Sequence, residues 1–189
     1  MSRKISLLGP DGAHALSLLA RIDVAELLLV APGAPKTADE VAAAVARADS
    51  RRRVHGGEGF GDLRGSAVVV LAREASDAEL LELSRTAPSA VLVVAAGDIE
   101  RECGRVLDTT SLPRPRVIGV ASETDLARPD EGSAELAAAV FLDRGHVLRC
   151  VARCQGEAGL EGMHTVRARV GAGGVTEILA AASPSRRAP

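Results

Sequence analysis

Short apolar segments alternate with amphipathic ones along the first part of the chain. Because consecutive positions in the apolar runs are hydrophobic, these runs predict strands buried on both faces. The segments between them repeat apolar residues at helical spacing and predict helices. We expect strands at residues 5–8, 26–30, 67–72, 90–95 and 117–120, and helices at 13–21, 37–48, 77–86 and 98–107. Strands of this kind separated by helices indicate a parallel sheet covered on both faces.

Helix starts are marked by capping residues. Thr37 and Glu40 have the spacing of a capping box, which should open the second helix. Ser76 or Asp77 should start the third helix in the same way. After the second helix, residues 51–54 form a basic segment that we interpret as a possible short strand.

The pattern changes after Val120. The polar segment 128–135 (RPDEGSAE) predicts a loop. Beyond it, apolar and polar residues alternate over 146–154, 162–170 and 175–179, and glycine-containing turns separate these segments. Such alternation is typical of antiparallel strands. Residues 183–189 should fray as a flexible tail.

A glycine turn follows the first predicted strand. Gly9, Gly12 and Ala15 form a G-x-x-G-x-x-A pattern between strand and helix. In nucleotide-binding α/β domains, small residues at such a turn let a diphosphate approach the backbone and the helix N-terminus. A second glycine-rich segment, 55–61 (HGGEGFG), is better explained as a flexible connection than as a phosphate cradle, because no helix start or Lys-Ser/Thr pair follows it.

The amino-acid composition argues against several classes of function. The 189 residues are 47% hydrophobic and only 1% aromatic, which predicts one aliphatic-core domain with at most a small appendage. A net charge of −2 and few aromatic rings argue against nucleic-acid binding. No apolar run approaches the roughly 20 residues of a membrane span, and the N-terminal run is too short for a secretory leader. We therefore expect a cytoplasmic protein that does not associate with membranes.

The cysteines carry no metal-binding spacing, and we expect no metal site. Cys103, Cys150 and Cys154 are interpreted as buried free thiols in a reducing compartment. A disulfide or redox pair is the alternative.

Five segments, in order, resemble the malate and lactate dehydrogenase family. Residues 5–23 resemble its first βα unit, and residues 63–72 and 88–98 its fourth and fifth strands. The other two segments are 112–128, which resembles the family segment that ends in an L-D-x-A-R motif, and 146–179, with a G-E-x-G turn and a G-x-x-G-V-x-x-I ending.

The resemblance implies a fold and a division of the chain. The fold would be α/β, a Rossmann-like doubly wound, mostly parallel sheet with a reduced C-terminal antiparallel β portion. Residues 1–128 would resemble the NAD-binding domain. Residues 129–182 would be a truncated remnant of the catalytic domain, ahead of the tail at 183–189.

Departures from the family affect cofactor binding. NAD-dependent members carry an acidic residue at the end of the second strand, to hold the adenine ribose. Here that strand ends at Val30 and Ala31. In the turn, Pro10 removes an N–H donor and Asp11 places a negative charge where a diphosphate would lie. We therefore expect no bound cofactor, and NAD if any. The degenerate cofactor positions are Gly9, Gly12 and Ala15.

The catalytic residues depart further. Asp125 and Arg128 match the L-D-x-A-R motif, whose Asp orients the catalytic histidine and whose Arg binds the substrate carboxylate. The segment with that histidine is missing, so these two are expected only as remnants, in an ion pair or an oligomer contact. The substrate loop is also absent, and Arg73 is interpreted as a solvated charge. Gly97 and Asp98 stand where the family has an asparagine. Surface positions are predicted for His14, His55, His146 and His164.

Three functional hypotheses follow. The first is a catalytically inactive dehydrogenase-like protein that serves as a structural, scaffold or regulatory subunit, with itself or another protein as partner. The alanine-rich runs 42–48 and 134–139 would make close helix contacts in such an assembly, or pack in the core. The alternative is an NAD(P)-dependent oxidoreductase acting on a small 2-hydroxy acid. The second alternative is a nucleotide-sensing module.

Overall fold

The structure, a computed structural model, describes residues 4–9, 11–22, 26–48, 53–121, 129–143 and 145–182. The strands are β1 (Lys4–Leu8), β2 (Glu26–Val30), β3 (Val54–Gly57), β4 (Ser66–Leu71), β5 (Val91–Val94), β6 (Val117–Val120), β7 (His146–Gln155), β8 (Glu161–Gly171) and β9 (Gly174–Ala181). The helices are α1 (Gly12–Arg21), α2 (Pro35–Ala48), α3 (Asp77–Thr86), α4 (Ile99–Thr109) and α5 (Pro129–Leu142). Short 3-10 turns are η1 (Phe60–Leu63), η2 (Arg114–Arg116) and η3 (Glu157–Gly159).

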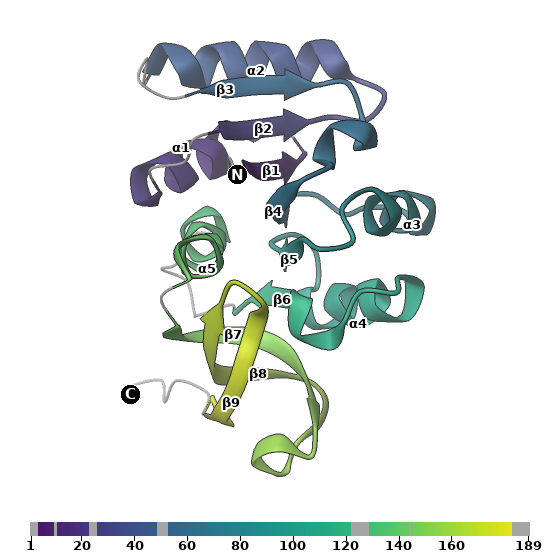
Figure 1. Ribbon diagram of the computed structural model, residues 1–189, viewed down its shortest axis with the longest axis vertical. Helices are drawn as coiled ribbons and strands as arrows, with labels where there is room; N and C mark the ends of the chain where they lie inside the picture. The colour runs from purple at the N-terminus through teal and green to yellow at the C-terminus, as the bar shows by residue number, and fades with distance from the viewer. Residues whose placement is uncertain are drawn as a thin grey trace, which may run out of the picture.

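The strands form one nine-stranded sheet in the order β3-β2-β1-β4-β5-β6-β7-β8-β9 (Figure 1). β1 to β6 pair in parallel, and β7, β8 and β9 add to β6 as antiparallel strands. This arrangement confirms the predicted mostly parallel α/β sheet with a C-terminal antiparallel portion. Because β7 pairs with β6, the sheet continues across the proposed boundary at residue 128, and that division of the chain stays a prediction.

Helices cover both faces of the sheet. α1 and α5 lie on one side, and α3 and α4 lie on the other (Figure 1). Alternate residues of one strand enter different cores: Ile5 and Leu7 join the core under α1, α2 and α5, whereas Leu8 joins the core under α3 and α4. Burial on both faces is the physical reason that the parallel strands are apolar at every position.

Helix α5 corrects the loop predicted over residues 128–135, of which 129–135 are described. It begins at Pro129, a residue type suited to the first helical position, and Asp130 and Glu131 follow in its first turn, where acids interact well with the helix dipole. Its alanines at 134, 137 and 139 are buried in the core. Core packing therefore explains the alanine run here, and proline, serine and glycine hid the helical pattern in the sequence.

The α2–β3 pair also differs from expectation. α2 begins at Pro35, so Thr37 and Glu40 lie inside the helix rather than at its start. The short strand expected at 51–54 is instead β3, which takes residues from the supposed flexible glycine segment. Gly56 is required in β3 because a Cβ there would lie 2.1 Å from Oδ1 of Asp39 in α2. This close packing of helix on strand accounts for part of the glycine content.

The C-terminal strands coil strongly (Figure 1). β9 also packs against η2. Gly174, the first residue of β9, has φ +90°, and a Cβ there would lie 1.9 Å from the carbonyl oxygen of Pro115. The β8–β9 pairing shifts register at Arg167/Ala168 and again at Arg169/Val170. Such irregularities increase local twist, which helps the strands to curl.

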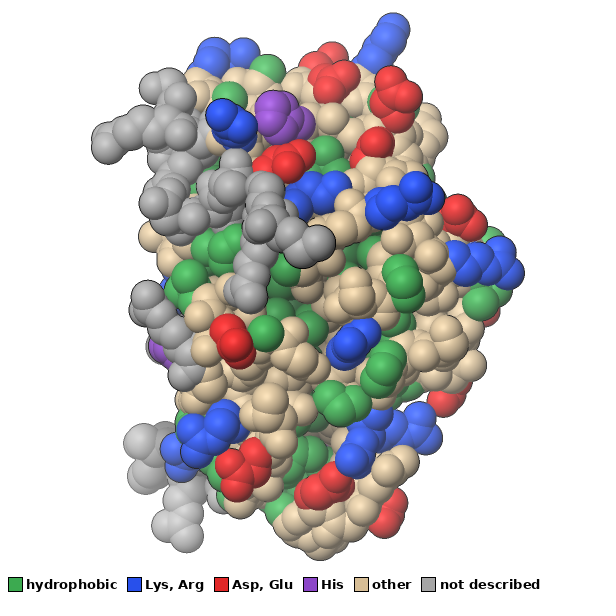
Figure 2. Space-filling view, viewed as in Figure 1, with side chains coloured by type: hydrophobic (Ala, Val, Ile, Leu, Met, Phe, Trp, Pro, Cys, Tyr) green, Lys and Arg blue, Asp and Glu red, His purple; other side chains and the backbone are tan. Residues whose placement is uncertain are grey.

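The surface has mixed charge. On the face shown in Figure 2, basic and acidic side chains are interspersed, so that face has no extended area of one sign. The helices within the described ranges include none that is long and apolar enough to cross a membrane. The absence of a nucleic-acid partner stays a prediction.

Candidate functional site

The candidate site lies at the carboxyl ends of β1 and β4. The sheet order reverses around β1, which lies between β2 and β4. In open α/β sheets, ligands bind in the crevice formed at such a reversal. The turn with Gly9 and Gly12 follows β1 there, and Arg73 follows β4. The fold thus places the sequence-predicted glycine turn in the expected position.

The N-terminus of α1 is capped by the chain's own carboxylate. Oδ1 of Asp11 accepts hydrogen bonds from the N–H groups of Ala13 (2.7 Å) and His14 (3.3 Å). Partial burial opposes ionisation of Asp11, but these N–H donors outweigh it and hold the pKa of Asp11 below its usual value. The free N–H groups that would attract a phosphate are therefore already bound to an anion.

His14 corrects the prediction of a surface residue, because only 7% of it is exposed. It lies on the buried face of α1 together with Ala15, Leu18 and Leu19. Its Nδ1 is 3.3 Å from Oδ2 of Asp11, yet neither ring nitrogen has a hydrogen-bond partner in the described part of the chain. The helical spacing of His14 and Leu18 was the sequence signal for its burial.

Arg73 covers the other glycine of the turn. Gly9 has φ +97°, and a Cβ there would lie 3.0 Å from Cγ of Arg73. Arg73 itself is held by Glu79 in α3, through Nη2–Oε1 at 2.5 Å and Nη1–Oε2 at 3.2 Å. The prediction of a solvated charge was wrong: Arg73 is half-buried and ion-paired.

Glu79 joins this ion pair to a helix cap. Its Oε2 accepts from the N–H of Ser76, while Oγ of Ser76 accepts from the N–H of Glu79, which forms a capping box for α3. The hydrogen bond from Arg73, together with those from Ser76, lowers the pKa of Glu79 to about 2. The sequence predicted Ser76 as a cap but gave no sign of the contact with Arg73.

We expect Glu79→Gln to lower the free energy of unfolding at neutral pH but not at acid pH. In the folded state the pKa of Glu79 is lowered from 4.5 to about 2. The ionised carboxylate therefore adds to the free energy of unfolding above pH 4.5, and this contribution is lost as the pH falls toward 2. The variant should lose about 1–2 kcal/mol at neutral pH, a figure kept small because the pair is partly solvated. Urea unfolding from pH 7 to pH 3 measures this difference, which should shrink as the pH falls. Glu82→Gln, on the exposed side of α3, is the matched control. If the difference between Glu79→Gln and the wild type stays the same from pH 7 to pH 3, the ion pair with Arg73 does not stabilise the fold.

Further carboxylates line the same edge of the sheet. Gly97, after β5, has φ +76°, and a Cβ there would lie 2.7 Å from Oε1 of Glu74. Asp98 caps α4 by accepting from the N–H of Arg101 at 3.3 Å. Asp11, Glu74 and Asp98 thus lie at this edge of the sheet, whereas the charge of Glu79 is balanced by Arg73.

The adenine end of the crevice lacks the expected acid. β2 ends at Val30, whose neighbour across the parallel pairing is Gly57 at the end of β3. Glu58 follows Gly57 directly and is exposed at this edge. The sequence analysis looked for an acid only at the end of β2, whereas Glu58 follows β3. The carboxyl ends of parallel neighbours lie at the same edge of a sheet, so either strand can supply a residue there.

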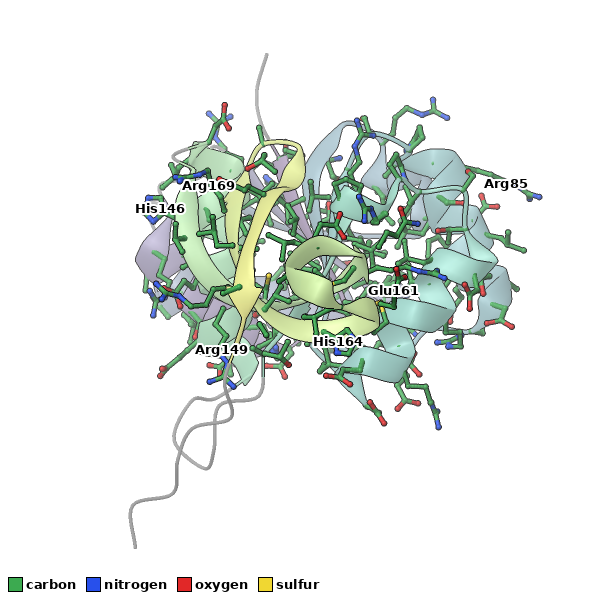
Figure 3. All side chains as sticks on the ribbon, turned by 90° about the horizontal axis from the view of Figure 1, so that it is seen from below. Arg85, His146, Arg149, Glu161, His164 and Arg169 are labelled. Atoms are coloured by element: carbon green, nitrogen blue, oxygen red, sulfur yellow. The ribbon has the colours of Figure 1, made fainter. Side chains whose placement is uncertain are left out.

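Other predicted residues lie elsewhere. Asp125, Arg128 and Pro10 are outside the described residues. His55 and His146 are exposed, and Nε2 of His164 contacts the carbonyl oxygen of Glu161 at 2.6 Å. Figure 3 shows His146 and His164 on the C-terminal strands, which are separate from the α1 turn. Within the described ranges, only His14 among the histidines is in the crevice.

Among the described residues, neither a cysteine nor a metal-binding cluster adds a reactive group to this site. Cys103, Cys150 and Cys154 are free and buried, as predicted. Burial raises the pKa of each thiol, which keeps it protonated and unreactive. Over the described segments, no cluster of three or more His, Cys, Asp or Glu side chains could hold a metal ion.

Comparison with solved structures shows which fold this is. The chain superimposes on malate dehydrogenase from Cryptosporidium parvum (TM-score 0.82, 11% identity, 98% of this chain and 93% of that chain). It also superimposes on Archaeoglobus fulgidus malate dehydrogenase in complex with NADH (TM-score 0.81, 17% identity, 97% and 92%). A lactate dehydrogenase from C. parvum, complexed with lactic acid and NAD, gives TM-score 0.78 at 15% identity, with 96% and 91% covered. No protein-family model and no curated protein matches the sequence. The chain therefore has the fold of the malate and lactate dehydrogenases.

Proposed function

We propose that this chain is a catalytically inactive relative of the malate and lactate dehydrogenases that serves as a structural, scaffold or regulatory subunit. The single observation that carries the proposal is the carboxylate of Asp11 on the N-terminus of α1. A diphosphate and this carboxylate would compete for the same N–H donors. The side chain of Arg73 over Gly9 also restricts access to the backbone of the turn.

The available bases also support inactivity. Hydride transfer to or from a 2-hydroxy acid requires a group that exchanges the hydroxyl proton. In the described crevice the only imidazole is that of His14, which is buried against Asp11. Arg73, the nearby cation, donates to Glu79 through both Nη1 and Nη2 and is therefore a poor clamp for a substrate carboxylate.

A subunit role requires a surface for assembly. α1 and α2 flank a groove of 390 Å³ lined by Leu16, Val41 and Ala44 among others. Leu16 is 45% exposed and gives this groove a large apolar side chain that a partner could cover. We propose this groove as the place where a second copy of the chain or another protein packs. Sedimentation of the purified chain at micromolar concentration gives its mass and tests self-association.

The proposal predicts that the purified chain neither oxidises NADH with oxaloacetate or pyruvate nor binds NADH, NADPH, ATP or ADP. Spectrophotometric assay and calorimetry measure the two properties. Turnover that Arg128→Ala abolishes would disprove inactivity. Asp11→Gly, which uncovers the α1 N–H groups, should bind pyrophosphate measurably, at a cost of only about 0.3 kcal/mol in stability, because glycine is itself a good N-cap residue. Gly61→Asp, which adds an acid in open space at η1, is the control and should bind none.

A nucleotide-sensing role is the second candidate, favoured by the space around Gly12. A Cβ on Gly12 would contact nothing within 4 Å, so a ligand can approach the backbone there. The A. fulgidus malate dehydrogenase was solved in complex with NADH, and the C. parvum lactate dehydrogenase with NAD. Saturable heat with any of the four nucleotides, without turnover, would favour this role over the scaffold role.

A further inference from the structure

A separate cavity lies inside the curl of the C-terminal strands. It has a volume of 300 Å³ and is bounded by η2, β7, η3 and β9. The close crossing of Gly174 over Pro115 fixes the position of β9 relative to η2, so this wall is set by backbone contact. The cavity is distant in topology from the α1 turn, because β9 is the far edge of the sheet.

The cavity walls combine apolar and cationic groups. Ala152, Val175 and Ile178 belong to or pack against the hydrophobic core and give the apolar part of the lining. Pro115 adds a further apolar side. A volume of 300 Å³ lies at the lower end of the roughly 300–1,000 Å³ of small-molecule pockets. The space thus suits a small ligand with a short hydrocarbon part rather than a nucleotide.

Arg114 supplies the polar group at this cavity. Its Nη1 donates to Oε1 of Glu157 at 2.7 Å, and about one third of each side chain is exposed. A guanidinium has five N–H donors, and this contact uses only one side of the fork. The remaining donors can bind a carboxylate without displacing Glu157.

Glu157 acts as a fixed counter-charge. The N–H of Gln155 donates to its carboxylate and, together with Arg114, holds the pKa of Glu157 below its usual value. Glu177, the other acid of the lining, is paired with Arg169 at 3.2 Å. Arg153 also lines the cavity and is paired with Asp108, which is not part of the lining. Both acids of the lining are thus neutralised by arginine, and the guanidinium donors that remain favour an anion.

We propose that this cavity binds a small aliphatic carboxylate, with its carboxylate on Arg114 and its hydrocarbon against Ala152, Val175 and Ile178. This site goes beyond the proposed subunit role and is independent of the α1 crevice. It would give the chain a small-molecule ligand even if the crevice binds none.

An NMR titration of the ¹⁵N-labelled full chain with sodium isovalerate tests the site, with sodium chloride matched for ionic strength. We expect saturable shifts of the backbone amides of Val175, Thr176 and Ile178. Arg114→Met should weaken binding at least about tenfold, because a charge-assisted hydrogen bond is lost. The uncharged analogue 3-methylbutan-1-ol should also bind at least about tenfold more weakly. Arg85→Met, on the helix remote from the C-terminal strands in Figure 3, is the matched control and should not change binding.

Three results would overturn the proposal: no saturable shift at those amides, equal binding of the alcohol, or an Arg114→Met variant that titrates like the wild type. The amide map of the wild-type chain does not depend on any variant. If Arg114→Met fails to fold, Ile178→Phe replaces it, since it fills the cavity and leaves Arg114 in place. That variant should lose the isovalerate response, and retention of the response would equally overturn the site.

Discussion

Replacing Gly174 by alanine is expected to lower the free energy of unfolding by about 4 kcal/mol, from left-handed backbone strain and a steric clash. The φ of +90° disfavours any L side chain, and the new Cβ would lie 1.9 Å from the carbonyl oxygen of Pro115. Because the clash is with backbone, relief requires β9 to move away from η2. Urea denaturation followed by circular dichroism measures the change.

The neighbouring Gly173 gives a matched control. A Cβ on Gly173 would contact nothing within 4 Å, so Gly173→Ala should change stability by less than about 0.5 kcal/mol. Equal effects of the two substitutions would show that β9 does not cross η2 as described. The same pair of variants probes the wall of the carboxylate cavity, because Gly174→Ala should also weaken the isovalerate shifts.

Replacing Arg105 by methionine is expected to lower the free energy of unfolding by about 3 kcal/mol, the lower end of the cost of breaking a buried ion pair. Among the described residues, Glu102 then keeps only the longer contact with the exposed Arg101, at 3.7 Å. Nη2 of Arg105 contacts Oε2 of Glu102 at 2.5 Å, and only 6% of the Glu102 side chain is exposed. Nη1 also pairs with Asp77 of α3 at 2.6 Å. Arg105 therefore joins α3 to α4 while neutralising a buried carboxylate.

A double variant separates the two roles of Arg105. Arg105→Met with Glu102→Met removes the buried charge together with its partner, and should recover more than half of the loss. Arg85→Met, at an exposed position of α3, should have little effect. No recovery in the double variant would mean that the α3–α4 link, rather than the buried Glu102, carries the stability.

The sequence predicted the parallel part of the fold because its strands are apolar at every position. The runs around Leu7, Leu29 and Val69 have no other explanation in a chain of this composition. The cap Ser76 was also predicted, since a capping residue acts on N–H groups a few positions away. A capping interaction joins residues that are close in sequence, so a short sequence motif is enough to predict it.

The crevice contacts could not be predicted because they join residues distant in sequence. Arg73 was expected to be solvated, since nothing in its neighbourhood shows that it lies across Gly9. α5 was missed because its first turn contains proline, glycine and serine, and its helical character depends on packing against α1. The roles of Asp125 and Arg128 lie outside the described residues and stay predictions.

The two register shifts along β9 have a consequence for how copies of this chain can meet. A flat, regular outer strand offers a row of unpaired N–H and C=O groups on which another chain can form fibrils. The shifts at Arg167/Ala168 and Arg169/Val170 twist β9, so its free groups do not form a straight row. The opposite border, β3, spans only Val54–Gly57 and is too short to template a long partner. Both borders of the sheet thus resist fibril growth, and specific contacts between copies are left to the helical surfaces.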